Sequence, residues 1–281
     1  MTSAPELADL DPQRLYLLVL GIGNAFTRRF FNSSFLLIAG GQFVAIDCPA
    51  PFRRVLHDAG NRAGLSVDLD AIDHLVLTHL HGDHCNGLEE YGFFRRYVLP
   101  GKQPGHLYLL PENLAPLWER RLHAVMAEGV DPKTGRHVAR SLEDYFLPHC
   151  WEPGEVHRLA GEDAPGVEFA IRRTRHPVPC FGFRASFGGV TLGYSADSPF
   201  ETEHLEFLAS SDLIVHEAGE GTGHAALDKL QALDESVRRK IVLIHVPDAY
   251  HERDLEFPIL EEGRLYEVGN GRSPIALNTA S

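Results

Sequence analysis

The sequence predicts an α/β protein in the form of a four-layer αββα sandwich, with two mixed β-sheets flanked by helices. Two observations lead to this class: each half of the chain contains a run of short apolar segments typical of a strand meander, and each also contains alternating strands and amphipathic helices. That arrangement is typical of two sheets packed face to face with helices outside. We expect residues 1–281 to form a single domain with a helical and loop insertion at about 105–165.

The first half contains four predicted strands and one predicted helix, which are strand 15–20, strand 34–39, strand 42–47, helix 51–63 and strand 72–77. The pair Gly40-Gly41 predicts a hairpin turn between the second and third strands. The helix opens with Pro51 and carries apolar residues at helical spacing. A strand, a helix and a strand therefore lead into a polar segment that begins at Thr78.

The middle of the chain is less regular. Residues 111–128 place Leu114, Trp118 and Leu122 on one face, which predicts an amphipathic helix packed on a core. Residues 129–165 are polar and rich in Gly and Pro, and this composition favours an inserted loop or subdomain over a separate domain.

The second half contains five predicted strands and two predicted helices, which are strands 167–175, 180–187, 190–195, 212–217 and 240–246 and helices at about 201–210 and 224–237. The helices stand between the later strands. This alternation predicts a second mixed sheet.

Composition and charge limit the partners that this chain can have. It has 26 Lys and Arg against 39 Asp and Glu, a formal net charge of −13, which disfavours loose binding to nucleic-acid backbones and anionic membranes. No apolar run reaches the roughly 18 residues needed to cross a bilayer. The four cysteines form no CxxC pair and the first residues show no secretory pattern, so we expect a cytoplasmic protein.

The strongest chemical signal is the segment THLHGDH at 78–84, directly after a predicted strand. His79 and His81 are two residues apart, so an extended backbone projects them the same way. Asp83 and His84 follow a glycine that permits a tight turn. Four metal-type ligands then converge on a small volume. Imidazole suits Zn, Fe or Ni, and the carboxylate adds a ligand that Mn or Fe also accepts.

Three more candidate ligands stand at the ends of apolar runs in the second half: His176, Asp197 and His245. Each alone is a weak signal. Their repetition at strand ends strengthens them, because the ligands of sheet-based sites gather at one edge of the sheet.

This order of residues strongly resembles the metallo-β-lactamase superfamily, whose signature is HxHxDH followed by a separate His, an Asp and a final His. The match runs along residues 15–246 and implies the metallo-β-lactamase fold with two metal ions. The seven implied ligands are His79, His81 and His176 for one ion, Asp83, His84 and His245 for the second, and Asp197 as the bridge between them.

Within the superfamily, the chain is most similar to ribonuclease Z and related phosphodiesterases. The segments that carry this similarity are LTHLHGDHCNGL, HPVPCFGFRA, GYSAD, LIVHEAG and GHAAL. The resemblance implies a binuclear metal-dependent hydrolase, in which a metal-bridging hydroxide attacks the phosphodiester of a nucleotide or a short nucleic acid. We expect two divalent ions. Zinc is the first choice, and Mn or Fe are the alternatives.

The resemblance also implies a source for the proton that the leaving oxygen needs. His224, in GTGHAAL, stands at the position of the branch's proton-donating histidine, and Glu217 is expected to orient it. Asp83 is expected to accept the proton of the attacking water in addition to binding metal. His216 is assigned no role.

The substrate class stays open at this point. HEAG replaces the HEAT pattern of the branch, and residues 129–165 do not look like its basic arm for transfer RNA, so we expect tRNA to bind weakly or not at all. A lactonase or another carboxylic-ester hydrolase is the alternative on the same metal site. An oxidoreductase with one iron on His79, His81 and His176 and a non-catalytic binding protein are disfavoured by the complete ligand set. A homodimer is left open.

Three other features attract attention but are given structural interpretations. GIGNAF at 21–26 resembles the start of a dinucleotide-binding GxGxxG, yet Phe26 replaces the third Gly, so we expect a turn over the metal site. The arginines at 28–29 and 172–175 are expected to be mostly solvated surface charge, and Cys85 a small buried residue.

Overall fold

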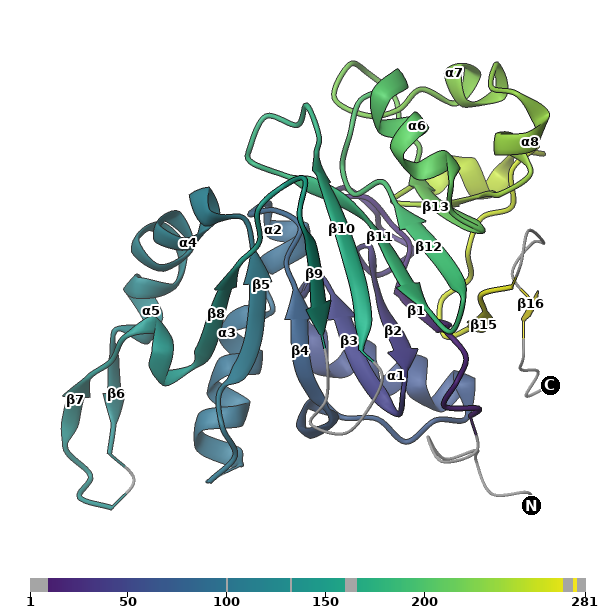
Figure 1. Cartoon of the computed structure of the whole chain (residues 1–281). Helices are drawn as coiled ribbons and strands as arrows, with labels where there is room; N and C mark the ends of the chain where they lie inside the picture. The colour runs from purple at the N-terminus through teal and green to yellow at the C-terminus, as the bar shows by residue number, and fades with distance from the viewer. Residues whose placement is uncertain (1–9, 100, 132, 160–165, 270–274, 277–281) are drawn as a thin grey trace.

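Two large β-sheets pack face to face, with helices on the outside (Figure 1). The computed structural model describes residues 10–99, 101–131, 133–159, 166–269 and 275–276. Within this part of the chain the predicted αββα sandwich is confirmed.

The larger sheet has the strand order β16-β15-β1-β2-β3-β4-β5-β8. Its strands are β1 (Tyr16–Gly21), β2 (Ser34–Ala39), β3 (Gln42–Ile46), β4 (Ile72–Val76), β5 (Gly105–Leu109), β8 (Phe146–Cys150), β15 (Leu265–Glu267) and β16 (Ile275–Ala276). The first three form the predicted antiparallel meander, and β3, β4, β5 and β8 run parallel to one another. Gly40 and Gly41 both have positive φ, as the predicted turn between β2 and β3 requires.

The smaller sheet has the strand order β14-β13-β12-β11-β10-β9. Its strands are β9 (Val156–Leu159), β10 (Val167–Arg173), β11 (Phe181–Phe187), β12 (Val190–Tyr194), β13 (Leu213–Glu217) and β14 (Ile241–Ile244). Strands β9 to β12 pair antiparallel, whereas β12, β13 and β14 are parallel.

The α-helices connect the strands and cover the sheets. They are α1 (Phe52–Ala63), α2 (Gly82–Cys85), α3 (Leu88–Phe93), α4 (Pro111–Leu117), α5 (His123–Met126), α6 (Thr202–Ala209), α7 (Leu227–Gln231) and α8 (Glu235–Arg238). Helix α1 links β3 to β4 and buries Phe52, Val55 and Leu56 in the core on the outer side of the larger sheet. Helix α6 packs in a separate core with β13 and β14.

The main core lies between the two sheets and is rich in aromatic side chains. Phe183 and Phe169 meet edge to face with ring centroids 5.2 Å apart, and Tyr194 meets Phe35 across the interface at 5.0 Å. All four are at most 1% exposed. Edge-to-face contacts suit aromatic rings because the positive ring edge meets the negative face.

The region expected to be an insertion at about 105–165 differs from the prediction. Strands β5 and β8 of this region belong to the larger sheet and β9 belongs to the smaller one, so the part that leaves the sheets before β8 is the segment 110–145. The sequence pattern missed these strands because each is short and carries polar residues, as in GHLYL and FLPHC. Residues 132 and 160–165 of this region lie outside the described residues.

Two predicted helices are divided into shorter pieces. The segment at 111–128 forms α4 and α5 with a π-helical turn at Trp118–Leu122 between them, followed by the hairpin of β6 (Glu128–Val130) and β7 (His137–Ala139). The segment at 224–237 forms α7 and α8, which Ala232, Leu233 and Asp234 separate.

Strand direction brings the polar segments of both halves together. Strands β4, β10, β12 and β14 each lead directly to a segment that carries candidate ligands, and α2 lies just beyond the end of β4 (Figure 1). Because β10, β12 and β14 run in the same direction, their carboxyl ends meet at one edge of the smaller sheet.

The aromatic core allows a stability test. Phe183→Ala should lower the free energy of unfolding by about 3–5 kcal/mol, because it leaves a cavity between the sheets. Urea titration followed by circular dichroism measures the change. Val156→Ala is the control, since Val156 is 66% exposed on the edge strand β9 and should change stability by less than about 0.5 kcal/mol. Equal losses in both variants would contradict the assignment of the core.

Candidate metal centre

The THLHGDH segment runs through a loop at 78–81 into the single turn of α2, which begins at Gly82. His79 and His84 are fully buried, and His81 and Asp83 are partly exposed. The amide of His84 donates to the carbonyl of His81 at 3.1 Å, which turns the chain so that Asp83 and His84 face back toward His79 and His81. The predicted tight turn after the histidine pair is confirmed.

The first group of candidate ligands unites the two halves of the chain. His79, His81, His176 and Asp197 each offer one atom, and these atoms lie within 4.8 Å of one another. His81 Nδ1 and His176 Nε2 are 2.9 Å apart, and His79 Nε2 lies 3.8 Å from Asp197 Oδ2. His176 and Asp197 come from the segments after β10 and β12.

The second group consists of Asp83, His84 and His245, again with atoms within 4.8 Å of one another. Asp83 Oδ2 lies 3.4 Å from His84 Nε2 and 3.3 Å from His245 Nε2. Asp197 faces this group as well, with Oδ1 at 3.4 Å from His84 and Oδ2 at 3.6 Å from His245. The seven residues singled out by the motif therefore form two adjacent groups, and Asp197 stands between them.

The donor atoms have the chemistry that a pair of cations requires. His79 Nε2, His84 Nε2, His176 Nδ1 and Asp197 Oδ1 are buried without a hydrogen-bond partner, a costly state for polar atoms. Burial lowers the pKa of His176 to about 4, so its imidazole is neutral, the form that binds metal. Burial also acts to lower the pKa of His245, but Asp197 and Asp83 raise it to about 10. The negative charge of Asp83 and Asp197 therefore favours a positive partner at this place. The candidate ligands thus fit bound divalent ions.

Backbone strain gathers at the same place. In the described part of the chain only Asp47, Ala196 and His245 are non-glycine residues with positive φ, at 61°, 47° and 53°. Each belongs to the site or adjoins it. His245 is a candidate ligand, Ala196 precedes the candidate ligand Asp197, and Asp47 contacts His84. Such conformations cost energy and persist where the surrounding structure demands a particular side-chain direction.

Glu217 and His224 lie beside the second group. His224 Nδ1 is 2.5 Å from Glu217 Oε2, and His245 Nδ1 is 3.4 Å from the same oxygen. The Glu217 carboxylate also accepts a hydrogen bond from the backbone of Ser198. The hydrogen bond with Glu217 raises the pKa of His224. The expected contact between Glu217 and His224 is therefore present.

A cavity of about 320 Å³ opens at the metal groups. Its lining combines candidate ligands with the loop after β1, namely Asn24, Ala25, Phe26, His81, Gly82, Asp83, His176, Asp197, His224 and His245. The expectation that GIGNAF forms a turn over the metal site is thus confirmed. The volume is at the lower end of the 300–1,000 Å³ range, roughly, of small-molecule pockets.

A family model described as "Anti-Pycsar protein Apyc1" matches residues 15–265 of this chain. An anti-Pycsar protein Apyc1 from Saccharibacillus brassicae is 32% identical over 263 residues, which cover 90% of this chain and 99% of the relative. The chain belongs to the anti-Pycsar Apyc1 family.

Solved structures show the same fold. The metallo-β-lactamase fold protein YhfI from Bacillus subtilis superposes with a TM-score of 0.69 at 18% identity, covering 90% of this chain and 99% of that one. The short form of human tRNase Z superposes with a TM-score of 0.65, also at 18% identity and with the same coverage. These likenesses confirm the predicted metallo-β-lactamase fold.

The predicted class of function is confirmed by this membership. This Apyc1 family member is a metal-dependent hydrolase of the phosphodiesterase type, with clusters suited to divalent ions. Among the described residues, none of the helices is both long and apolar enough to span a membrane.

Asp47 is a residue of the site that the sequence analysis missed. It is fully buried at the end of β3, where its Oδ2 lies 2.8 Å from His84 Nδ1 and its Oδ1 accepts from the Thr78 amide at 2.8 Å. A carboxylate on the far nitrogen of a metal-binding histidine sets the orientation and basicity of the ring. The signal in the sequence that could have identified Asp47 is its position directly after the apolar run QFVAI.

The remaining features of the Apyc1 family member match their structural interpretations. Cys85 is buried at 3% exposure. Arg172 pairs with Glu203 at 2.8 Å on the surface, and Arg173 pairs with Glu112. Arg28 is exposed.

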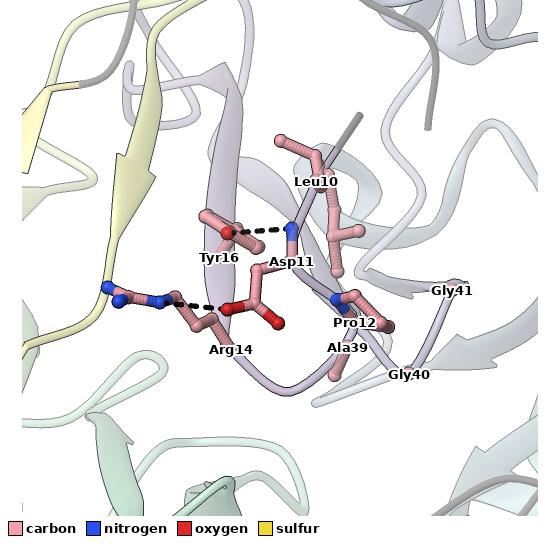
Figure 2. Close-up of a pocket in the computed structure, with 9 residues that line it drawn as sticks. Leu10, Asp11, Pro12, Arg14, Tyr16, Ala39, Gly40 and Gly41 are labelled. Carbon is pink, nitrogen blue, oxygen red and sulfur yellow. Dashed lines mark hydrogen bonds and ion pairs between the residues drawn. The ribbon is translucent and has the colours of Figure 1, made fainter. Parts of the chain in front are cut away.

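A second cavity, of about 330 Å³, lies near the turn between β2 and β3, and Figure 2 shows the residues that line it. Tyr16 Oη accepts from the Asp11 amide at 3.2 Å, and Arg14 Nε donates to Asp11 at 3.3 Å. The metal-type clusters found in the described residues do not include any of these side chains. The two cavities have similar volumes, so size does not show which one is the functional site. The metal-type ligands that line the first cavity identify it as the site.

The contact between Asp47 and His84 predicts an effect on metal affinity. Asp47→Asn keeps the shape of the side chain but removes its charge, so it should weaken divalent-ion binding about tenfold. Competition against a chelating dye measures the affinity, and circular dichroism confirms that the fold is kept. Asp70→Asn, at an exposed position, is the matched control. Unchanged affinity in the Asp47 variant would show that the contact does not tune the site.

Proposed function

We propose that this protein is a phosphodiesterase that uses two zinc ions to open the cyclic phosphodiester of a single nucleotide. The observation that carries the proposal is the pair of ligand groups that meet at Asp197 within a cavity of about 320 Å³. Two adjacent cation positions are the arrangement suited to in-line displacement at phosphorus.

The residue assignments follow the two groups of side chains. The proposed ligands are His79, His81 and His176 for one ion, Asp83, His84 and His245 for the other, and Asp197 for both. Imidazole is the main donor in this set, which favours zinc, with Mn or Fe as alternatives. When bound, such ions lower the pKa of a water molecule and stabilise charge on the attacking and leaving oxygens.

The size of the cavity supports a single nucleotide. A pocket at the lower end of the small-molecule range holds one nucleotide better than a polymer. A phosphodiester contained in one nucleotide is necessarily cyclic. The formal net charge of −13 further disfavours a nucleic-acid substrate, since phosphate backbones are held chiefly by Lys and Arg.

The proposed proton transfers use side chains that line the cavity. Asp83 lines the cavity, and its carboxylate takes up the proton of the attacking water. His224 donates a proton to the leaving oxygen. Glu217 contacts Nδ1 of His224, so it orients the ring and leaves Nε2 for the substrate.

We also propose that the chain is one domain, because a continuous core fills the space between its two sheets. A cytoplasmic location fits the four cysteines, all of which are free thiols. A homodimer stays a prediction, and sedimentation of the purified protein tests it.

Metal content and substrate preference test the proposal together. Elemental analysis of the active protein should find two divalent ions per chain. Hydrolysis should be fastest on a cyclic mononucleotide, slower on bis(p-nitrophenyl) phosphate, and weak on a p-nitrophenyl ester and a lactone. One ion in the fully active protein would refute the two-ion site. A lactone or ester as the best substrate would instead identify a carboxylic-ester hydrolase, and tight, salt-sensitive binding of tRNA would restore an RNA substrate.

The role of His224 predicts a dependence on the leaving group. His224→Ala should reduce kcat about 10²- to 10⁴-fold on a substrate that leaves as a ribose alkoxide, because that oxygen needs a proton. The loss should shrink on p-nitrophenyl diesters, whose leaving group is stable without one. Both ions should remain bound. Equal losses on the two substrates would mean that His224 positions the substrate, and no loss would leave it a structural residue.

A further inference from the structure

Phe26 is an aromatic side chain held in solvent at the mouth of the metal cavity. It is 88% exposed, the largest fraction among the exposed large hydrophobic side chains of the described residues. It also lines the cavity together with Asn24 and Ala25. Exposed apolar residues are common on protein surfaces, so exposure alone carries no function. Its position at the metal cavity and the hydrogen bonds that fix its loop are what indicate a role for Phe26.

The loop that presents Phe26 is closed by its own hydrogen bonds. The Phe26 amide donates to Asn24 Oδ1 at 3.0 Å, and the Thr27 amide donates to the Asn24 carbonyl at 3.2 Å. The side-chain amide of Asn32 donates to the same carbonyl at 2.8 Å. Gly23 permits this close turn, because a Cβ there would lie 2.4 Å from Cγ2 of Thr27.

The loop is also bound to the strand end that carries His245. Thr27 Oγ1 donates to Asp248 Oδ1 at 2.5 Å, and the Arg28 amide donates to the other Asp248 oxygen at 3.0 Å. The Asn24 amide donates to the carbonyl of Val246, the residue after His245, at 3.3 Å. The backbone at Phe26 is therefore fixed relative to a candidate metal ligand, while the ring is exposed to water.

We propose that Phe26 favours diesters that carry a base over those that lack one, by stacking on the base of the nucleotide whose phosphodiester lies at the metal groups. This inference rests on the proposed function. A planar base would cover the exposed ring and remove apolar surface from water, and stacking is tolerant of base identity because every base has a π-face. The hydrogen-bonded loop fixes the backbone that carries the ring, so the loop itself does not have to be ordered on binding.

Two diesters with and without a base test the role of Phe26. The first is a 3′,5′-cyclic nucleotide, and the second is trimethylene phosphate, which keeps a six-membered cyclic diester but lacks sugar and base. Phe26→Ala should lower kcat/KM about tenfold on the nucleotide, mainly through KM, and change it by less than about twofold on trimethylene phosphate. Phe26→Trp should retain the wild-type value on both. Val156→Ala, which removes an exposed side chain far along the chain on β9, is the control.

Fluorescence gives a readout that does not depend on turnover. The indole introduced by Phe26→Trp should be quenched by a nucleoside 5′-monophosphate but not by inorganic phosphate, whereas the wild-type protein, with Trp118 and Trp151, should show no comparable change.

Four results would overturn the inference. Equal loss on both diesters in Phe26→Ala would mean that the side chain shapes the loop, and no loss with no quenching would mean that it does not contact the base. If metal-loaded wild-type protein hydrolyses neither diester, the proposed function fails and the inference fails with it. Hydrolysis of both substrates with an unaffected Phe26→Ala variant would refute the inference alone.

Discussion

The carboxylate of Asp197 is the contact on which the arrangement of the centre depends. It is 2% exposed and lies 3.4 Å from His84, 3.6 Å from His245 and 3.8 Å from His79. These histidines come from both sheets, so one side chain relates the two halves of the sandwich. In a buried place such a carboxylate requires positive partners. The surrounding unpartnered imidazole nitrogens make the site a place for cations.

Two carboxylates that are not among the proposed ligands contact the histidines of the site. Asp47 at the end of β3 contacts His84, and Glu217 at the end of β13 contacts both His224 and His245. Both acidic residues terminate apolar strands, so the sheets place them without any separate element. The left-handed backbone at Asp47 and His245 is the local cost of aiming these side chains at one point.

The substrate side of the site is built differently from the metal side. Strand ends and the single turn of α2 hold the ligands, whereas the loop 24–31 forms the opposing wall of the cavity through Asn24, Ala25 and Phe26. Because Asp248 and Val246 tie this loop to the segment after β14, wall and ligands share one anchor. This shared anchor fixes the position of the loop relative to His245.

Local patterns in the sequence by themselves determined the alternating strands, the helix at 52–63 and the spacing within THLHGDH, because these depend on neighbours in the chain. Position at the ends of apolar runs, together with the resemblance to a family motif, pointed to the distant His176, Asp197 and His245. Strands β5 and β8 were missed, since polar residues interrupt their short apolar sequences and pairing in a parallel sheet makes them strands. Asp47 beside His84, the cavity and the exposed ring of Phe26 were decided by tertiary structure alone. They depend on contacts between segments as far apart as Thr27 and Asp248, 221 residues along the chain, and chain topology rather than local spacing creates those contacts.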